Sequence, residues 1–557
     1  MAYDLAVDPT GNVYVTGSSR VSETNTDYTT TKYDASGNQL WVKTYNGTGN
    51  AFDVATAIAT DANGNVYITG QSEGSGSSYL DYVTIKYDTH GNELWVRRYD
   101  GPGVSTDFVA AIAVDIAGNV YITGSSYGIT SSTDYATIKY DTDGNIVWVS
   151  RYDGPGNGFD GANALVLDAI GNVYVTGYST GIGTAEDYAT VKYNQDGVQQ
   201  WVTRYNGPAN SLEQAFSLGL DPSGNVYVTG QSFEIVSGSA FATIKYNAAG
   251  VEQWVSRYHA GTASDFGKAL AADDAGNVYV IGKVNNDGSD FGDDFTTIKY
   301  NANGVEQWVA RYNGPDQDND QANALALDAG GNVYVTGFSS KVSETGSQSD
   351  YTTIKYNSAG AEQWIAQYNG PGNNSDIATA IQVDANDNVY ITGFSNGNGT
   401  EADYATIKYT QVLQPCGNNN NKVVVCHKGK PTCISPVDLK DHLKHGDQLG
   451  PCASPIVAAK TKDNVDAGSL RVVHFPNPVT TITQIQYDLP VDGEVDIRVY
   501  DIMGTQVSSI AAVNRKAGNY TINFDASTLR NGVYYYKVIL KSKNRLFVQT
   551  CKMSIIR

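Results

Sequence analysis

Basic residues and long apolar runs are both scarce in this chain of 557 residues. Residues 1–410 hold 19 Lys and Arg against 47 Asp and Glu, a net charge of −28. A segment with that charge repels phosphate backbones, which argues against nucleic acid as a partner and leaves cations or basic surfaces as ligands. Since no run of about 18 apolar residues occurs, the sequence predicts no membrane-spanning helix.

Residues 1–410 also lack cysteine, and their only histidines are His90 and His259. No nucleophile with a paired base can be assembled from this set, so the sequence argues against catalysis. Both histidines fall in expected loops and are predicted to be solvated. The first residues, MAYDLAVDPTGN, have neither the basic start nor the apolar core of a secretory signal peptide.

A short element, Gly-Asn-Val-Tyr or a close variant, occurs eight times at intervals of 52 to 56 residues. Its copies begin at Gly11, Gly64, Gly118, Gly171, Gly224, Gly276, Gly331 and Asp387. A period of that size over some 400 residues is typical of one supersecondary unit stacked repeatedly. The repeat therefore determines the expected fold of residues 1–410.

One repeat, taken as Asp53 to Gly103, contains four strand-sized runs separated by turn residues. The expected strands are Ala55–Thr60, Asn65–Gln71, Asp81–Tyr87 and Glu93–Tyr99. The first and second strands, and again the third and fourth, are joined by [DN]-x-x-G turns, in which the glycine takes a positive φ. Residue size rises from the first strand to the fourth, as wedge-shaped blades around an axis require. The sequence thus predicts an all-β propeller of four-stranded blades.

Two residue types recur at one position of each repeat. Each of the seven tryptophans lies in a fourth strand, and packing between neighbouring blades is a better explanation than a stacking platform for sugars or bases. The tryptophans are Trp41, Trp95, Trp148, Trp201, Trp254, Trp308 and Trp364. A lysine recurs in eight third strands, where we expect it to pair with an acid such as Asp81 or Asp134. Eight equivalent residues indicate architecture, because catalysis needs one special residue.

The hairpin DxxGNVYVTG followed by YxTIKY resembles the bacterial β-propeller repeats of the SBBP type, over about residues 1–410. That resemblance implies a propeller that is often secreted or surface-bound, and it implies no particular activity. The chain provides seven full units and an eighth without its tryptophan strand, so seven or eight blades are expected, with eight favoured. The incomplete first repeat suggests a native N-terminus longer than this one.

Residues 411–455 form a separate module rich in cysteine and histidine, followed by an expected linker at 456–470. Two disulfides among Cys416, Cys426, Cys433 and Cys452 would suit a small exported segment. The second alternative is a zinc site built from Cys426, Cys433, His442 and His445, the histidines lying on one face of a helix that Ser435 begins and Gly446 ends. The third is a mixture of the two, such as a Cys416–Cys452 bridge around a site. The module resembles short segments that precede sorting domains in surface proteins of Bacteroidetes-like bacteria.

The sequence of residues 471–557 predicts about seven short strands, as many as a small Ig-like sandwich contains. Pro476-Asn477-Pro478, Tyr500-Asp501-x-x-Gly504, Gly532-Val-Tyr534 and a tail containing Lys552 occur in the order found in type IX secretion sorting domains, which this segment resembles. The resemblance implies the type IX machinery as a partner, the outside of a Gram-negative cell as the location, and an N-terminal export signal that the printed sequence does not contain. The alternative is an adhesive sandwich that stays on the mature protein.

Two functions are therefore considered: a secreted or surface binding scaffold for an extracellular glycan, protein or cation, and a propeller enzyme. The [DN]-x-x-G turn does not match the Asp-box pattern of sialidases. It resembles the docking motifs of quinoproteins more closely, but the sequence lacks the vicinal cysteine pair of those enzymes. For binding, the loops between second and third strands vary in length and chemistry, as a ligand surface would.

An acid begins the innermost strand of seven blades: Asp53, Asp107, Asp160, Glu213, Asp265, Asp320 and Asp376. These carboxylates either accept hydrogen bonds from their own loops or form a negative ring at the channel mouth that holds Ca²⁺ or a cationic ligand. No cofactor other than this Ca²⁺, or zinc in the Cys/His module, is expected.

Overall fold

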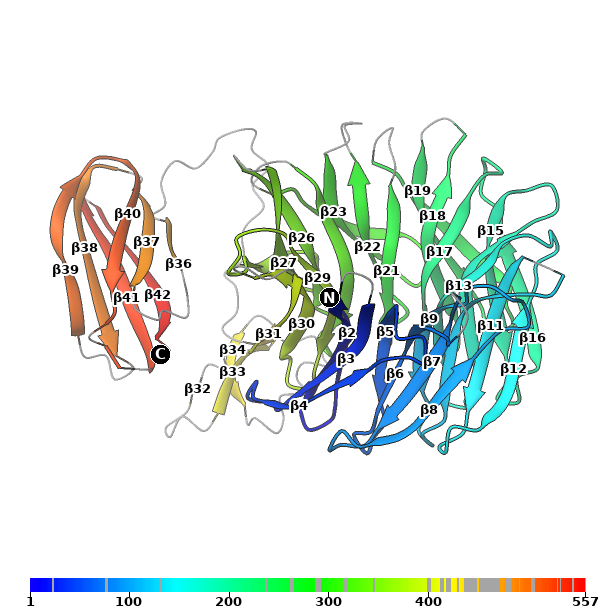
Figure 1. Ribbon diagram of the computed structural model, residues 1–557. Helices are drawn as coiled ribbons and strands as arrows, with labels where there is room; N and C mark the ends of the chain where they lie inside the picture. The colour runs from blue at the N-terminus through cyan, green and yellow to red at the C-terminus, as the bar shows by residue number, and fades with distance from the viewer. Residues whose placement is uncertain are drawn as a thin grey trace. The chain divides into compact units, whose positions relative to one another are not determined.

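The structure is a computed structural model, and it divides into two compact units, Met1–Ala453 and Ser454–Arg557. Within residues 1–410 it describes everything except residues 23–24, 76–78, 131, 236–237, 261–264, 286–291, 315–317, 344–345 and 398–401. Beyond residue 410 it describes the strands given below and most of 491–555. Each unit is described by itself (Figure 1).

One repeat shows how the local sequence builds a sheet. The strands β5 (Asp53–Thr60), β6 (Val66–Glu73), β7 (Leu80–Tyr87) and β8 (Glu93–Tyr99) pair in sequence order, all antiparallel. The turn after β5 is closed by Asp61, whose Oδ1 accepts hydrogen bonds from the backbone N–H groups of Asn63 and Asn65 at 2.9 Å each. Gly64 has a φ of 78°, as the [DN]-x-x-G pattern predicts.

The same meander is repeated along residues 1–410. The remaining four-stranded sheets are β1 (Ala2–Val7), β2 (Val13–Ser22), β3 (Asn25–Tyr33) and β4 (Gln39–Tyr45); β9 (Phe108–Val114), β10 (Val120–Tyr127), β11 (Thr133–Tyr140) and β12 (Ile146–Tyr152); β13 (Asp160–Leu167), β14 (Val173–Thr180), β15 (Glu186–Tyr193) and β16 (Gln199–Tyr205); β17 (Glu213–Leu220), β18 (Val226–Phe233), β19 (Ser239–Tyr246) and β20 (Glu252–Tyr258); β21 (Phe266–Ala272), β22 (Val278–Asn285), β23 (Asp293–Tyr300) and β24 (Glu306–Tyr312); and β25 (Asp320–Leu327), β26 (Val333–Ser343), β27 (Gly346–Tyr356) and β28 (Glu362–Tyr368). In the described residues the last sheet has three strands, β29 (Asp376–Val383), β30 (Val389–Asn396) and β31 (Ala402–Tyr409).

Neighbouring sheets share their apolar cores, and the last sheet packs against the first. Tyr390 of β30 belongs to one cluster with Leu5 and Val15 of the first sheet. Thr379 Oγ1 donates to the carbonyl of Ala2 at 3.3 Å, across 377 residues of sequence. The sheets therefore close on themselves in a propeller-like arrangement (Figure 1).

The tryptophans join consecutive sheets, as the sequence predicts. Trp95 of β8 lies between Tyr67 of its own sheet and Tyr140 of the next, with ring centroids 6.2 and 6.0 Å away. Its Nε1 donates to the carbonyl of Thr142, in the next sheet's turn, at 3.2 Å. These contacts leave the ring no free face for a ligand.

The C-terminal unit has seven described strands in two antiparallel sheets around one apolar core that includes Ile485, Val499, Tyr536 and Met553. One sheet has the order β36-β37-β40 and the other β39-β38-β41-β42. The bounds are β36 (Arg471–Phe475), β37 (Ile482–Leu489), β38 (Gly493–Asp501), β39 (Gln506–Arg515), β40 (Gly518–Asp525), β41 (Gly532–Ser542) and β42 (Arg545–Ile555). The finer Ig-like assignment stays a prediction.

Short strands also occur in the Cys/His module: β32 (Pro415–Cys416), β33 (Lys422–His427), β34 (Lys430–Ile434) and β35 (Gln448–Leu449). The described residues contain no helix whose length and apolar character would let it span a membrane.

Candidate functional site

The repeat sheets have two different ends. The turns that join first to second and third to fourth strands lie at one end, here called the turn end. The loops that join second to third strands, and the connections between sheets, lie at the other, here called the loop end. The turn end is nearly uniform in sequence, whereas the loop end varies. We therefore expect a ligand site at the loop end.

The seven acids that precede or begin the innermost strands lie at the loop end, and all seven are completely buried. Asp160 is typical: Oδ2 accepts a hydrogen bond from the N–H of Gly154 at 2.6 Å, and Oδ1 accepts one from Thr180 at 3.0 Å. Asp107 binds Gly101 and Tyr127 in the same way, at 2.7 and 3.0 Å. Six of the seven carboxylates, all except Glu213, thus accept a hydrogen bond from a backbone N–H group of their own loop, as the first alternative predicts. Cation binding by these acids stays a prediction.

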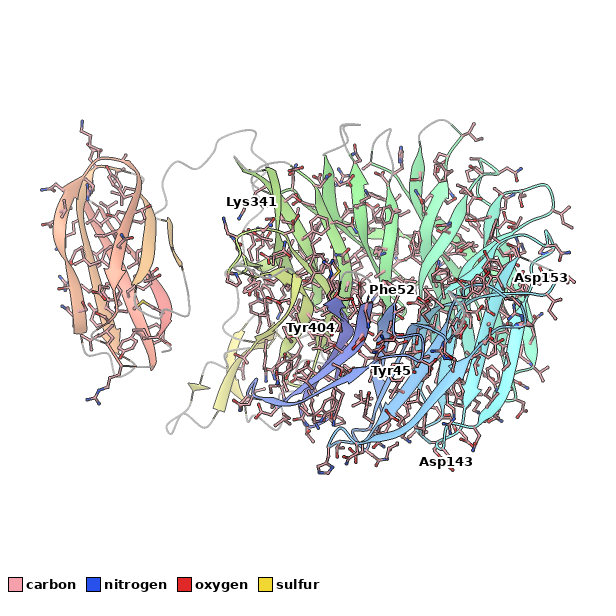
Figure 2. All side chains as sticks on the ribbon, in the orientation of Figure 1. Tyr45, Phe52, Asp143, Asp153, Lys341 and Tyr404 are labelled. Carbon is pink, nitrogen blue, oxygen red and sulfur yellow. The ribbon has the colours of Figure 1, made fainter. Side chains whose placement is uncertain are left out.

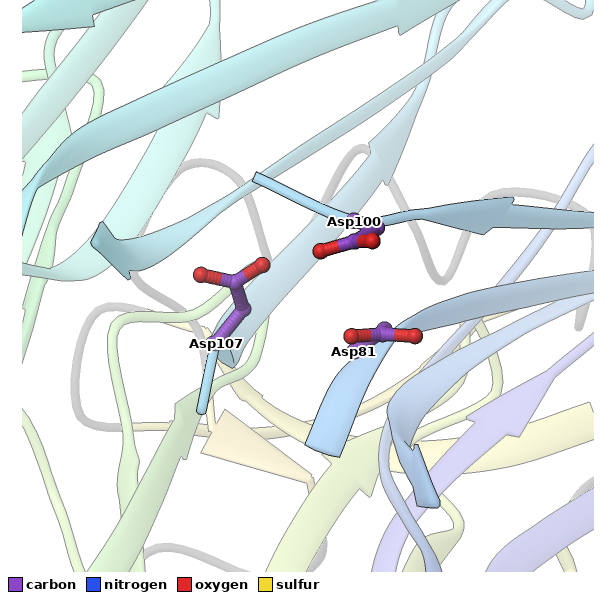
Figure 3. Close-up of side chains that lie close together, drawn as sticks. All are labelled: Asp81, Asp100 and Asp107. Carbon is purple, nitrogen blue, oxygen red and sulfur yellow. The ribbon is translucent and has the colours of Figure 1, made fainter. Parts of the chain in front are cut away.

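At two places the buried acid is one of three neighbouring carboxylates. Asp81, Asp100 and Asp107 each place an oxygen within 4.8 Å of the other two (Figure 3). Asp134, Asp153 and Asp160 repeat that arrangement one sheet further on. The two sets are called the carboxylate trios. Three converging carboxylates are a ligand set that Ca²⁺ accepts.

Each trio is partly neutralised by an arginine of the fourth strand. Arg98 Nη1 lies 2.7 Å from Asp81 Oδ2, and Arg151 Nη2 lies 2.9 Å from Asp134 Oδ2. The prediction that the repeated lysine pairs with these acids is therefore wrong. Lys86 Nζ instead lies 5.1 Å from the Tyr67 ring centroid and donates to the carbonyl of Thr142 at 2.9 Å.

The middle acid of each trio was not singled out from the sequence. Asp100 and Asp153 follow the last tyrosine of the fourth strand, where the other repeats carry Asn46, Asn206, His259, Asn313 and Asn369. The signal was present as an Asp among asparagines at one repeat position. His259 occupies the same position, and its Nδ1 lies 3.1 Å from Asp265 Oδ2. Its prediction as a solvated loop residue is wrong, because it is partly buried against this carboxylate.

Burial raises the pKa of several of the buried acids. It raises the pKa of Asp107 and of Asp160 from the ordinary value, although their backbone hydrogen bonds favour the charged form. The pKa of Asp320 rises to about 6 and that of Glu213 to about 7, again chiefly through burial. Near pH 7 the folded protein thus holds carboxylates that a proton or a cation would stabilise.

This raised pKa predicts that the repeat sheets gain stability as pH falls. Between the ordinary glutamate pKa, about 4.3, and the folded value of about 7, the folded state binds more protons at Glu213 than the unfolded state. Stability from this group therefore increases as pH falls through 7 and is lost as pH rises. Glu213→Gln should remove about 1 to 2 kcal/mol of the difference in unfolding free energy between pH 7.5 and 5.5, measured by urea denaturation. An unchanged difference in Glu213→Gln would refute this assignment.

Single exposed apolar side chains occur in loops at the loop end of sheets two to five. Val104, Ile129, Ile182 and Ile235 lie in four different loops and are 86, 79, 80 and 74% exposed. Phe52, in the connection before β5, is also exposed and is labelled in Figure 2. The sequence predicts variable loops here, but not their shared apolar side chains. Exposed apolar side chains in variable loops on a fixed scaffold are available for contact with a partner.

The Cys/His module is described only in part. Cys426 and Cys433 lie on the neighbouring antiparallel strands β33 and β34, where Cys433 is opposite Val424. Cys416 lies in β32, and Cys452, His442, His445 and the expected helix lie outside the described residues. The disulfide and zinc hypotheses both stay predictions.

Known protein families match segments of the repeat sheets and of the C-terminal unit. Residues 94–129, 200–232 and 253–288 match the family described as "Beta-propeller repeat". Residues 473–550 match the family described as "Secretion system C-terminal sorting domain". The chain is a β-propeller-repeat protein with a type IX sorting domain. The sorting domain implies contact with the type IX machinery and a place outside the cell or on its outer surface.

Individual relatives are distant. A WD repeat-containing protein of Acanthamoeba polyphaga mimivirus, itself uncharacterized, is 24% identical over 326 residues, and the match spans 51% of this chain and 20% of that protein. The chain thus covers about a fifth of the length of this curated relative.

Solved structures are similarly remote. PorZ, an essential bacterial surface component of the type IX secretion system of Porphyromonas gingivalis, has a TM-score of 0.27 and 12% identity, over 100% of this chain and 81% of that one. An α-L-arabinanase of Penicillium chrysogenum has a TM-score of 0.32 and 14% identity, over 50% of this chain and 87% of that one. Similarity at this level carries no argument about function.

Proposed function

We propose that this β-propeller-repeat protein is a surface-displayed binding scaffold whose eight-bladed ring presents its loop end to an extracellular protein. The observation that carries the proposal is the set of exposed apolar side chains there, Val104, Ile129, Ile182 and Ile235. They stand on rigid sheets whose other end is uniform. A fixed frame with variable, apolar loops is what protein recognition uses.

Binding, rather than catalysis, is supported by the use made of the recurring residues. The repeated lysines and tryptophans contact carbonyl groups of the next sheet, as Lys86 and Trp95 both contact Thr142. These side chains therefore hold neighbouring sheets together. The loops are the part of each repeat that can vary without breaking these contacts.

The test compares the two ends of the same sheets. The variant Val104→Ser, Ile129→Ser and Ile182→Ser should lose cross-linked partners on the surface of the native cell. Its matched control, Ile116→Ser with Ile170→Ser, changes two exposed isoleucines of the turn end and should keep them. Equal retention of partners by the loop-end variant would overturn the proposal.

Calcium is the second ligand proposed for this end, held at the carboxylate trios. Calcium should raise the melting temperature by about 2 to 5 °C, because an ion that binds only the folded state stabilises it. Asp100→Asn with Asp153→Asn should abolish the shift while folding normally, since other repeats carry asparagine there. Calorimetry with and without calcium measures both proteins. A shift that persists in the double variant, or none in the parent, would exclude the trios as calcium sites.

A further inference from the structure

The arginines of the fourth strands occupy one defined position in their sheets. Arg151 lies opposite Ala136 of the third strand, and its Nη2 reaches back to Asp134 Oδ2 at 2.9 Å. It also donates to Ser126, from Nη1 to the hydroxyl at 2.8 Å and from Nη2 to the carbonyl at 2.7 Å. Arg204 makes the equivalent contacts in the next sheet. An aspartate and a serine thus form a binding position for a guanidinium group in these sheets.

The first sheet has the same position without an arginine. Thr44 of β4 takes the place of the arginine, opposite Thr29 of β3. Asp27 and Ser19, which correspond to the aspartate and the serine of the other sheets, are opposite each other on β3 and β2. Thr44 carries no charge and is exposed. The first sheet therefore keeps the acceptors of a guanidinium group and lacks the donor.

Asp27 has no cation as a partner among the described residues. Its carboxylate makes no ion pair or hydrogen bond with them, its Oδ1 is buried, and partial burial raises its pKa. The seventh sheet also lacks the arginine, since Gln367 takes its place. There Lys341 supplies the cation, with Nζ 2.7 Å from Asp350 Oδ2. The seventh sheet thus compensates for the missing arginine, whereas the first leaves Asp27 unpaired within the described chain.

A second carboxylate lies beside Asp27. Thr26 forms a parallel bridge with Phe52, which Figure 2 labels, so the residues that follow them, Asp27 and Asp53, are neighbours on one side of the bridge. Thr26 Oγ1 also donates to the carbonyl of Asp53 at 3.2 Å. Burial raises the pKa of Asp53, and the negative charge of Asp27 raises it further. A cation bound at Asp27 would relieve this repulsion.

We propose that Asp27 and Ser19, beside Thr44, bind the guanidinium group of an arginine that is not part of this sheet. The ligand class follows from the equivalent position in the third and fourth sheets, which a guanidinium group fills. Its planar fork matches a carboxylate and a hydroxyl better than a lysine ammonium does. The net charge of −28 in residues 1–410 favours a cationic ligand. A free arginine derivative and an arginine of a partner protein share this chemistry.

Isothermal titration calorimetry of the full chain tests the site with N-acetyl-arginine amide as the probe. We expect saturable one-to-one binding, and binding at least about tenfold weaker for the citrulline analogue, which has a similar shape without the charge. Asp27→Asn should weaken binding of the arginine probe at least about tenfold, whereas Asp143→Asn, an exposed turn-end acid, should leave it unchanged. Equal binding of the two probes, or equal binding by the parent and Asp27→Asn, would overturn the proposal.

Thr44→Arg supplies the missing guanidinium group from the chain itself. It should abolish binding of the arginine probe and raise the melting temperature by about 1 to 3 °C, because the folded state gains an ion pair. Thr44→Gln, the matched control, introduces the residue that the seventh sheet carries and should keep both properties of the parent. Adding Asp27→Asn to Thr44→Arg should remove the gain. Full probe binding by Thr44→Arg would overturn the proposal, and Asp27→Asn alone decides if Thr44→Arg folds poorly.

Cross-linking on the native cell distinguishes the two sources of arginine, and only this part of the test rests on the proposed function. Loss of the cross-linked partners in Asp27→Asn would assign the arginine to a partner protein. Retention of these partners, with probe binding lost in the purified variant, would assign the site to a free arginine derivative. Failure of the proposed function would appear instead as partners retained by the variant at Val104, Ile129 and Ile182, with the calorimetric result unchanged.

Discussion

Deleting residues 471–557 will leave the protein in the periplasm. The type IX machinery recognises its substrates by the sorting domain. The deletion removes all seven described strands of this domain together with their apolar core. With the same N-terminal signal on both proteins, fractionation of a host with a type IX system should find the full chain outside the outer membrane and at least about ten times less of the deletion there.

Two further measurements complement the deletion of residues 471–557. Deleting residues 411–455 alone should permit export, because the sorting domain is kept. Mass spectrometry of exported full-length protein should find its C-terminus near residue 470, since domains of this kind are removed at the surface. Normal surface delivery of the 471–557 deletion would contradict the sorting assignment.

Gly177→Ala will unfold the repeat sheets under mild denaturing conditions. An added Cβ at Gly177, in β14, would lie 1.9 Å from the carbonyl oxygen of Gly161 in the neighbouring strand β13. The backbone of the paired strand must move, so we expect a loss of about 3 kcal/mol in unfolding free energy, the upper end of the usual cost of overpacking. Urea denaturation of the full chain measures it.

The matched control is Gly183→Ala, in a loop. Its added Cβ meets no atom within 4 Å, and only its φ of 75° is unfavourable for alanine. That strain costs about 1 kcal/mol. Equal destabilisation by the two variants would mean that the close strand contact at Gly177 is not what constrains this position.

The architecture was predictable because each repeat carries the same local signals. The Asp61 turn with its positive-φ Gly64, the alternating apolar strands and the single tryptophan all act within about 50 residues. Eight copies in register turn weak local signals into one consistent pattern. The three described strands of the last sheet follow from the same pattern, since no Trp strand follows Tyr409 in the sequence.

Contacts between repeats were harder to predict. Lys86 lies 56 residues from Thr142, and local spacing gives no reason to choose a turn carbonyl over the nearer Asp81. Arg98 takes Asp81 instead, because its guanidinium also reaches the Ser72 hydroxyl at 2.7 Å. The carboxylate trios arise in the same way, from loops and strands of two consecutive sheets. Such contacts can be identified only once the relative positions of neighbouring repeats are known.

We propose that the loop end of the repeat sheets binds a partner and that the turn end does not. Hydroxyl-radical footprinting of the protein on intact cells, compared with the purified protein, tests this at individual side chains. We predict protection of Val104, Ile129 and Ile182 on the cell, with Ile116 and Ile170 equally reactive in both samples. Protection of the two turn-end isoleucines, with none at the three loop-end residues, would show that the partner binds the turn end instead.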